Sequence, residues 1–361
     1  MDAHEYAAQE QAKHKAAFDA FVSGNVQQQE SVKNALLEGN ARLGTKQVPG
    51  YADFLQNMGD PFSFLRKEVE DMRWLLLQTN GDKRLQACQP ERLPVIFTFT
   101  GEVNAEATAC PEDGTPIIRI DMAVYHWLVF VNRMLMRCTE RGTNRVDRKK
   151  EFLETIRPWT DFWLFGRSTA SLGELRRHFT ATLREPFGVH LSTQLTDWHV
   201  LWILAHEMAH VALGHTLDDV AASDANRRRE LDADSVATRY LLNTFGHLAR
   251  SQTFDAVAMP QEWVPATPLI LLMYFSYAET VHWGRGGAPA PTHPLARDRG
   301  EALVRFYDQE VSMPTAATLG LFAQIMVMRA SFAILDERGH PRPTELPPEP
   351  DLEWDIGERL C

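Results

Sequence analysis

The sequence has few cysteines, no long apolar run and no excess of positive charge. Four cysteines in 361 residues, none of them in a C-x-x-C pair, form no disulfide framework and favour a reducing compartment. The net charge of −11 argues against a nucleic-acid duplex as partner, because binding phosphates needs a basic surface. No apolar run reaches the roughly 20 residues that span a membrane, and the N-terminal residues lack the apolar centre of a signal peptide. We therefore expect a cytoplasmic protein without a membrane span and without nucleic acid as a partner.

The remaining composition is that of an ordinary globular protein. Hydrophobic residues make up 44% of the chain and charged residues 24%, which is enough to build a buried core. Residues 1–40 and 62–79 have the composition and apolar spacing of helices. Residues 93–100 and 116–121 are rich in β-branched and aromatic residues and predict two strands. Almost everything after residue 122 is typical of helices, so we predict a mainly α protein with a small β-sheet, of the α+β class.

Three regions are expected along the chain. Residues 1–90 would form an N-terminal helical region, residues 91–312 the core that carries the chemistry, and residues 313–361 a C-terminal helix with a proline-rich tail. The core contains a long insertion at about 128–195 that is rich in aromatic residues. It is a candidate lid or substrate platform, although packing in the core explains the aromatic residues equally well.

The segment 196–215 carries the clearest chemical signal. It holds His206-Glu207-x-x-His210 within an apolar helical pattern, with Asp197 as a candidate N-cap or first-turn acid. Residues four apart share one face of a helix, so both imidazoles can face one metal ion, and Glu207 can reach a water on that ion. The five-residue pattern His-Glu-x-x-His also occurs by chance in unrelated proteins. The apolar flanks, however, predict a buried helix, and buried polar groups without partners are costly. A metal ion would supply the partner.

A catalytic zinc needs a third protein ligand and leaves one position open for water. The metzincin spacing fails, because Leu213 and Thr216 stand where that class has glycine and histidine. A glutamate on the following helix is the alternative, and Glu230 lies 20 residues after His210. Asp234 is one turn further along the same face and could orient a ligand histidine. This acidic stretch would otherwise be a solvated helix start balanced by neighbouring arginines; beside the histidine helix, the ligand interpretation is preferred.

These motifs resemble a known family. His206-Glu-Met-Ala-His-Val-Ala-Leu-Gly-His215 followed by E-x-x-A-D at 230–234 resembles the gluzincin peptidases, which include the heat-shock membrane peptidase HtpX and the CAAX prenyl endopeptidases. The Asn-Ala pair at 104–105 with the strand that follows, and Thr-His-Pro at 292–294, resemble two further family segments. The pieces occur in the family's order over about 95–310.

The resemblance implies a role for each matching residue in the zinc helix and the glutamate helix. One zinc ion per chain would have three protein ligands: His206, His210 and Glu230. Glu207 would be the catalytic base and then the acid, and Asp234 would support the ligands. The substrate would be a protein or a peptide.

The resemblance also implies roles outside these two helices. His293 would stabilise the oxyanion, and Arg299 would organise the acidic ligands. The strand that contains Ile118 and Ile120 would be the sheet edge along which a peptide substrate pairs its backbone. The chain departs from the family in lacking membrane-spanning helices, in a short gap before the glutamate ligand, and in Leu295 where the family has a second proline. Membrane and prenylated substrates are therefore not expected.

Together the motifs predict a zinc-dependent endopeptidase that hydrolyses peptide bonds with a metal-activated water. One alternative has the same chemistry but a narrow purpose, as a regulatory protease that cuts one cytosolic protein in a stress, toxin or phage response. The other alternative is a non-catalytic binding module that contains zinc. Exchanging Glu207 for glutamine would leave such a module functional but would inactivate a protease.

Overall fold

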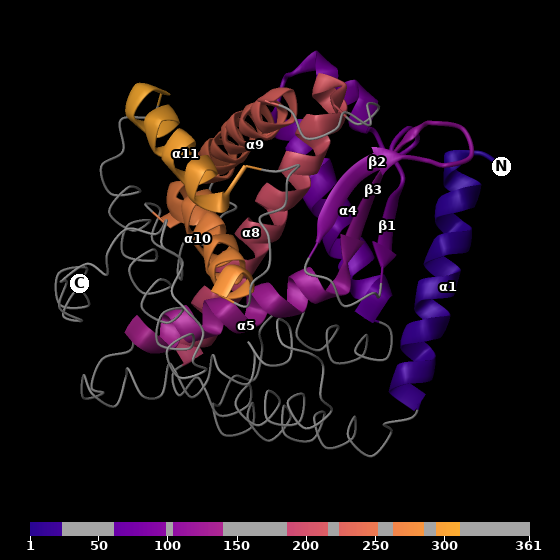
Figure 1. Ribbon diagram of the computed structural model, residues 1–361, viewed down its shortest axis with the longest axis horizontal. Helices are drawn as coiled ribbons and strands as arrows, with labels where there is room; N and C mark the ends of the chain where they lie inside the picture. The colour runs from indigo at the N-terminus through magenta and orange to yellow at the C-terminus, as the bar shows by residue number, and fades with distance from the viewer. Residues whose placement is uncertain are drawn as a thin grey trace. The chain divides into compact units, whose positions relative to one another are not determined.

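The computed structural model has the predicted α+β architecture, mostly helical with one small sheet (Figure 1). It describes residues 1–23, 61–98, 104–139, 186–215, 224–251, 263–284 and 294–310. The chain divides into two compact units, residues 1–128 with 203–218, and residues 129–202 with 219–361. The predicted boundaries at residues 90 and 312 stay predictions. Most of the predicted insertion, and all of the tail from 313, lie outside the described residues.

The sheet of the first unit has three strands in the order β1-β3-β2. β1 (Val95–Thr98) and β3 (Pro116–Asp121) are the two predicted strands, and they pair in parallel with Val95 opposite Ile118. β2 (Ala105–Ala109) was not predicted and pairs antiparallel to β3. The expectation that β3 forms an open edge is therefore wrong, because β3 is the middle strand.

Ile118 and Ile120 accordingly lie in a fully paired strand. Their exposed fractions are 0% and 5%, and each residue pairs with one residue of β1 and one residue of β2. The backbone N–H of Ile118 also donates to Pro94 O at 3.0 Å. A peptide cannot add to a strand whose neighbours already use its backbone groups, so these two residues do not offer an edge to a substrate.

The outer edge of β1 is covered by helix α1 (Ala3–Ser23). Phe97 N–H donates to the side-chain oxygen of Gln11 at 2.8 Å, and the Gln11 amide nitrogen donates to Phe97 O at 3.1 Å. The buried Gln11 amide thus replaces the hydrogen bonds of a neighbouring strand. Covering an edge in this way prevents another strand from pairing with it.

Helix α4 (Pro61–Thr79) and the short 3-10 helix η1 (Lys83–Cys88) also belong to the first unit. The buried guanidinium of Arg73 donates to Leu93 O at 2.5 Å and so links α4 to the segment that enters β1. The Cys88 thiol donates to Met208 O at 3.4 Å. Burial raises the pKa of Cys88 to about 12, so the thiol stays protonated and serves as a donor at physiological pH.

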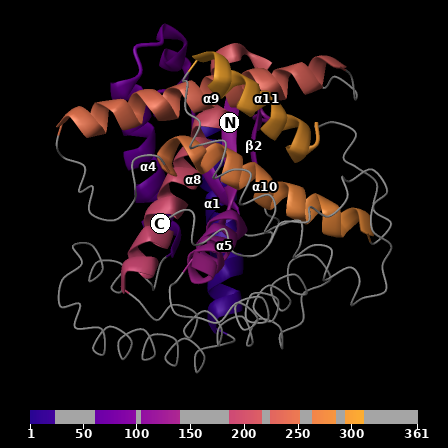
Figure 2. The same ribbon diagram turned by 90° about the vertical axis from the view of Figure 1, so that its left-hand side faces the viewer.

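The second unit is built from helices that pack directly on one another. Its described residues form α9 (Asp224–Ser251), α10 (Trp263–Gly284) and α11 (Ala296–Glu310), together with parts of α5 (Met122–Thr139) and α8 (Pro186–Leu213). α11 packs against both α10 and α9 (Figure 1 and Figure 2). The Tyr307 hydroxyl donates to Pro265 O at 2.5 Å and the Trp202 indole to Thr238 Oγ1 at 3.0 Å, so polar contacts fix the helix pairs as well.

A buried polar network joins α5, α8 and α10. The Asn132 amide donates to Thr196 Oγ1 at 2.9 Å and lies 3.1 Å from His199 Nδ1, while Tyr274 donates to Asn132 Oδ1 at 3.0 Å. Burial lowers the pKa of His199 to about 3, so the ring is neutral. His199 is therefore a core histidine of the helix packing and is separate from the chemical motif that follows it.

None of the described helices has the length and apolar character needed to cross a membrane.

Candidate metal centre

Helix α8 carries the predicted zinc motif on its C-terminal half. The helix begins at Pro186, so Asp197 lies inside it and is neither an N-cap nor part of its first turn. The segment from 200 to 209 is buried on every side, and His206 and Glu207 are each 6% exposed. The helix ends after Leu213 at Gly214, whose φ of 72° is the left-handed conformation typical of a helix C-terminus.

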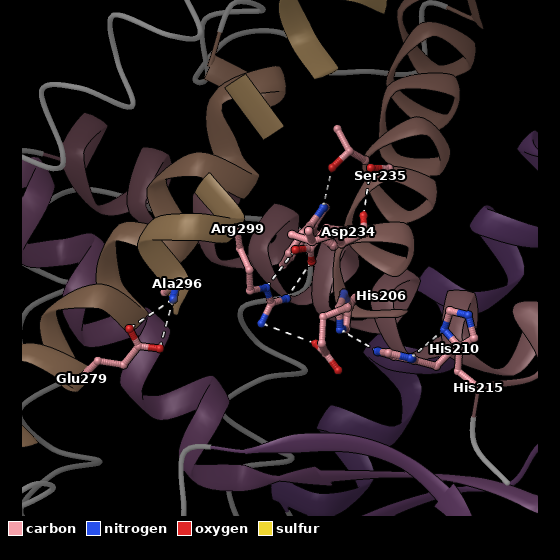
Figure 3. Close-up of polar contacts among 12 residues, drawn as sticks. His206, His210, His215, Asp234, Ser235, Glu279, Ala296 and Arg299 are labelled. Carbon is pink, nitrogen blue, oxygen red and sulfur yellow. Dashed lines mark hydrogen bonds and ion pairs between the residues drawn. The ribbon is translucent and has the colours of Figure 1, made fainter. Parts of the chain in front are cut away.

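The two motif histidines face each other on α8. His206 Nε2 and His210 Nε2 are 3.0 Å apart, and their rings meet edge to face. Two nitrogens bound to one tetrahedral zinc at about 2.0–2.1 Å would be roughly 3.3 Å apart, so the pair is close to the geometry of two ligands. His215 Nδ1 lies 3.2 Å from His210 Nδ1, as Figure 3 shows, and so contacts the ring atom on the other side of His210.

Glu230 of α9 is the predicted third ligand, and it belongs to the other compact unit of the chain. Two imidazole nitrogens and one carboxylate are a ligand set found at catalytic zinc sites, which keep the fourth position for water or substrate. The donor chemistry therefore suits zinc. Metal binding by these residues stays a prediction.

Arg299 of α11 joins the two acidic residues of α9. Its Nε and Nη2 donate to Asp234 Oδ2 and Oδ1 at 2.8 and 2.6 Å, a bidentate pair (Figure 3). Its Nη1 lies 3.7 Å from Glu230 Oε2. Asp234 is 1% exposed, and the side chains of Arg299 and Glu230 are 13% and 12% exposed. The resemblance implied this placement beside the acidic residues for Arg299. Asp234 was expected to orient a ligand histidine, and its described contact is with Arg299.

Glu279 is a residue of this region that the sequence analysis missed. It lies on α10, and both of its carboxylate oxygens are 3.1 Å from Ala296 N, the first amide of α11. Burial raises the pKa of Glu279 to about 7, against the opposing effects of the Ala296 amide and Arg299. No motif marks this residue, because its partner is a backbone amide 17 residues further along the chain.

The other predicted site residues have different outcomes. His293 lies outside the described residues, so its predicted role at the oxyanion stays a prediction. Glu207 is buried next to His206 on α8, and its role as the base also stays a prediction. Ile118 and Ile120 are in the middle strand of the sheet, as described above.

Comparison with known proteins points to proteolysis. A family model described as Peptidase U49 matches residues 195–316, about a third of the chain. No curated protein and no solved structure matches the chain. The matched segment contains all three candidate ligands, Glu207 and Arg299. This part of the chain is therefore similar to a peptidase family, and the match does not extend to the narrower likeness to HtpX or the CAAX prenyl endopeptidases.

Proposed function

We propose that this protein is a zinc-dependent endopeptidase whose metal is held by His206, His210 and Glu230. The observation that carries the proposal is the pair of His206 and His210, whose Nε2 atoms are 3.0 Å apart on α8, inside the segment that is similar to a peptidase family. Glu230, predicted from its spacing after the two histidines, lies within the same segment. Zinc bound there would polarise a peptide carbonyl and lower the pKa of a bound water.

Glu207 is the general base in this proposal. It follows the first candidate ligand directly on α8, and its side chain is withdrawn from solvent. A carboxylate in this position can take a proton from the attacking water and deliver it to the leaving amine. Arg299 keeps Asp234 and Glu230 in place on α9, so that the third ligand is ordered before a metal arrives.

The substrate would pair with β2 rather than β3. Cys110 N–H donates to Thr115 O and Asp121 N–H to Asn104 O, so even-numbered residues of β2 make the ladder with β3. The N–H and C=O groups of Ala105, Ala107 and Ala109 therefore point to the outer edge. Among the described residues, no backbone group hydrogen-bonds to that edge. An extended peptide can add there as a further strand.

The proposal is tested by zinc content together with activity. Elemental analysis of the purified wild type should give one zinc per chain, and Glu230→Ala should lose most of it. Asp232→Ala is the matched control, because Asp232 is an exposed acid on the same helix, two residues away. Glu207→Gln should keep the zinc and lose hydrolysis of a quenched fluorescent peptide library.

Three results would contradict the proposal in different ways. A wild type that contains no zinc and takes up none on addition would contradict metal binding. A Glu230→Ala variant with unchanged zinc content would contradict the role of Glu230 as the third ligand. Unchanged hydrolysis by Glu207→Gln would contradict the role of Glu207 as the base. A wild type that binds zinc but hydrolyses no peptide would favour the non-catalytic module.

A further inference from the structure

Helix α11 begins without a capping side chain of its own. Its first residue is Ala296, and the side chain of the preceding Leu295 has no atom that can accept a hydrogen bond. The first amides of a helix have no partner within the helix and are normally satisfied by a serine, threonine, aspartate or asparagine at that preceding position. Here the acceptor comes from another helix, because both carboxylate oxygens of Glu279 on α10 are 3.1 Å from Ala296 N (Figure 3).

The turn that Glu279 fixes is the turn that carries Arg299. The Arg299 N–H donates to Leu295 O at 3.0 Å, the first backbone hydrogen bond of α11. Three residues after Ala296, the Arg299 side chain leaves this turn to form its bidentate contact with Asp234 and its ion pair with Glu230. A frayed first turn would move the origin of that side chain, and the two carboxylates on α9 would lose their common partner.

We propose that Glu279 is a positioning residue for the metal centre: by capping α11 it fixes Arg299, which orders Asp234 and the ligand Glu230. The inference rests on the proposed function, since Glu230 is a ligand only in that proposal. Glu279 acts through Ala296 and Arg299 and has no contact with the candidate ligands among the interactions described. It is therefore a positioning residue and not a catalytic one.

The state of this carboxylate distinguishes it from an ordinary stabilising cap. Burial raises the pKa of Glu279 to about 7, so keeping it ionised at the start of α11 opposes folding. The charged groups that face it come from α11, where Arg299 and Arg297 lower the pKa and Asp298 raises it. On α9, Glu230 and Asp234 face Arg299. A residue present only for stability would not need a buried charge here.

The experiment measures zinc affinity in the full-length protein by competition with a chromogenic chelator. At pH 8, Glu279→Ala should bind zinc about tenfold more weakly than the wild type, the lower end of what loss of a supporting contact costs a metal site. Glu279→Gln fills the same space and keeps one acceptor oxygen, so a loss of about threefold is expected from the missing charge at the helix start. Glu301→Gln, an exposed acid on α11, is the matched control and should bind like the wild type.

A rescue variant tests the route through the helix start. Leu295→Ser in the Glu279→Ala background gives α11 an N-cap of its own, and it should restore most of the lost zinc affinity. Hydrogen exchange of the α11 amides near Ala296 should rise in Glu279→Ala and fall again in the double variant. Leu295→Ser alone should leave zinc affinity unchanged.

The pH profile gives a readout that a purely structural residue would not change. The wild type and Glu279→Gln should differ at pH 8 and converge below about pH 6, where Glu279 of the wild type is protonated as well. If Glu279→Ala does not fold, the test uses Glu279→Gln alone and asks whether its zinc affinity equals that of the wild type below about pH 6.

Two results would overturn the inference without touching the proposed function. The first is a wild type that binds one zinc with the same affinity as both Glu279 variants. The second is a loss in Glu279→Ala that Leu295→Ser does not restore, because Glu279 would then act directly at the site. A wild type that binds no zinc would overturn this inference and the proposed function together.

Discussion

The histidine side and the acidic side of the candidate site are built in different ways. His206, Glu207 and His210 lie within five residues of one buried helix, so the local geometry of α8 alone brings them together. Glu230 and Asp234 lie on α9, their arginine on α11, and the cap of α11 on α10. One side therefore depends on a single helix, and the other on contacts among three. We expect the first to tolerate changes elsewhere in the molecule and the second to be sensitive to them.

The largest effect should come from the histidine side, where chemistry can be removed without moving the helix. Glu207→Gln has the same size as the wild-type residue but cannot take a proton. We expect peptide hydrolysis to fall by about 10³-fold, the usual contribution of a general base, with zinc content and thermal unfolding unchanged. Parallel measurement of turnover and bound zinc checks this. Loss of zinc along with turnover would mean that Glu207 supports the site rather than the reaction.

Arg299 is expected to give the largest structural effect on the acidic side. Arg299→Ala would leave the Asp234 carboxylate, 1% exposed, without its bidentate partner. Removing one member of a buried ion pair is strongly destabilising, so the free energy of unfolding should fall by about 3 kcal/mol. Urea unfolding of the metal-free protein measures it. Arg297→Ala is the matched control, because Arg297 is a neighbouring, more exposed arginine paired with Asp298, and it should cost less than about 1 kcal/mol.

A double variant sharpens the interpretation of Arg299. Replacing both partners, as Asp234→Leu with Arg299→Met, removes the unpaired charge and should recover much of the lost stability. It should not recover zinc binding, because the arginine that orders Glu230 is still absent. Equal destabilisation of the single and double variants would show that the packing of Arg299, and not the ion pair, holds α11 in place.

The same contrast explains what could be predicted from the sequence. Helix α8, strands β1 and β3 and the fold class depend on local patterns of apolar and β-branched residues, which the sequence displays directly. β2 was missed because Ala-Glu-Ala-Thr-Ala is poor in residues that favour strands. The prediction that Ile118 and Ile120 lie on an edge failed for a related reason. Strand order is a non-local property, and the unrecognised β2 occupies the position given to β3.

The acidic side was only partly predictable. Glu230 and Asp234 were proposed because they share a helix face with the right spacing, and Arg299 because of the family resemblance. Glu279 has no such signal, since its partner is the Ala296 amide at the start of another helix. Helix α8 also begins well before Asp197, at Pro186, a residue favoured in the first turn of a helix.

The pH dependence of stability tests the acidic side without any metal. Glu279 has a pKa of about 7 in the folded protein against an ordinary value of 4.5, so the folded state holds its proton more tightly than the unfolded state. Its contribution to stability is therefore full below about pH 4.5 and is lost as the pH rises to about 7. Glu279→Gln does not titrate at this position, so its stability relative to the wild type should rise by about 2 kcal/mol over that range.

Urea unfolding at pH 5, 6, 7 and 8, with a chelator present, measures this difference. At pH 8 the variant should be at least as stable as the wild type while it binds zinc more weakly, so that stability and metal affinity change in opposite directions. A difference in stability that does not vary with pH would mean that the Glu279 carboxyl titrates near its ordinary value.

The smallest expected effect returns to the histidine side, where one contact reaches a candidate ligand from outside the motif. His215 Nδ1 lies 3.2 Å from His210 Nδ1, and a hydrogen bond at that atom keeps Nε2 of His210 available for a metal. His215→Ala should weaken zinc binding by about tenfold at most, because α8 itself still aims His210. His215→Asn, which retains a polar group that can make the same contact, should lose less, and chelator competition distinguishes the two. If His215→Ala weakened zinc binding as much as Arg299→Ala, the histidine side would depend on its surroundings as strongly as the acidic side does. The distinction between a histidine side that one helix builds and an acidic side that three helices build would then be wrong.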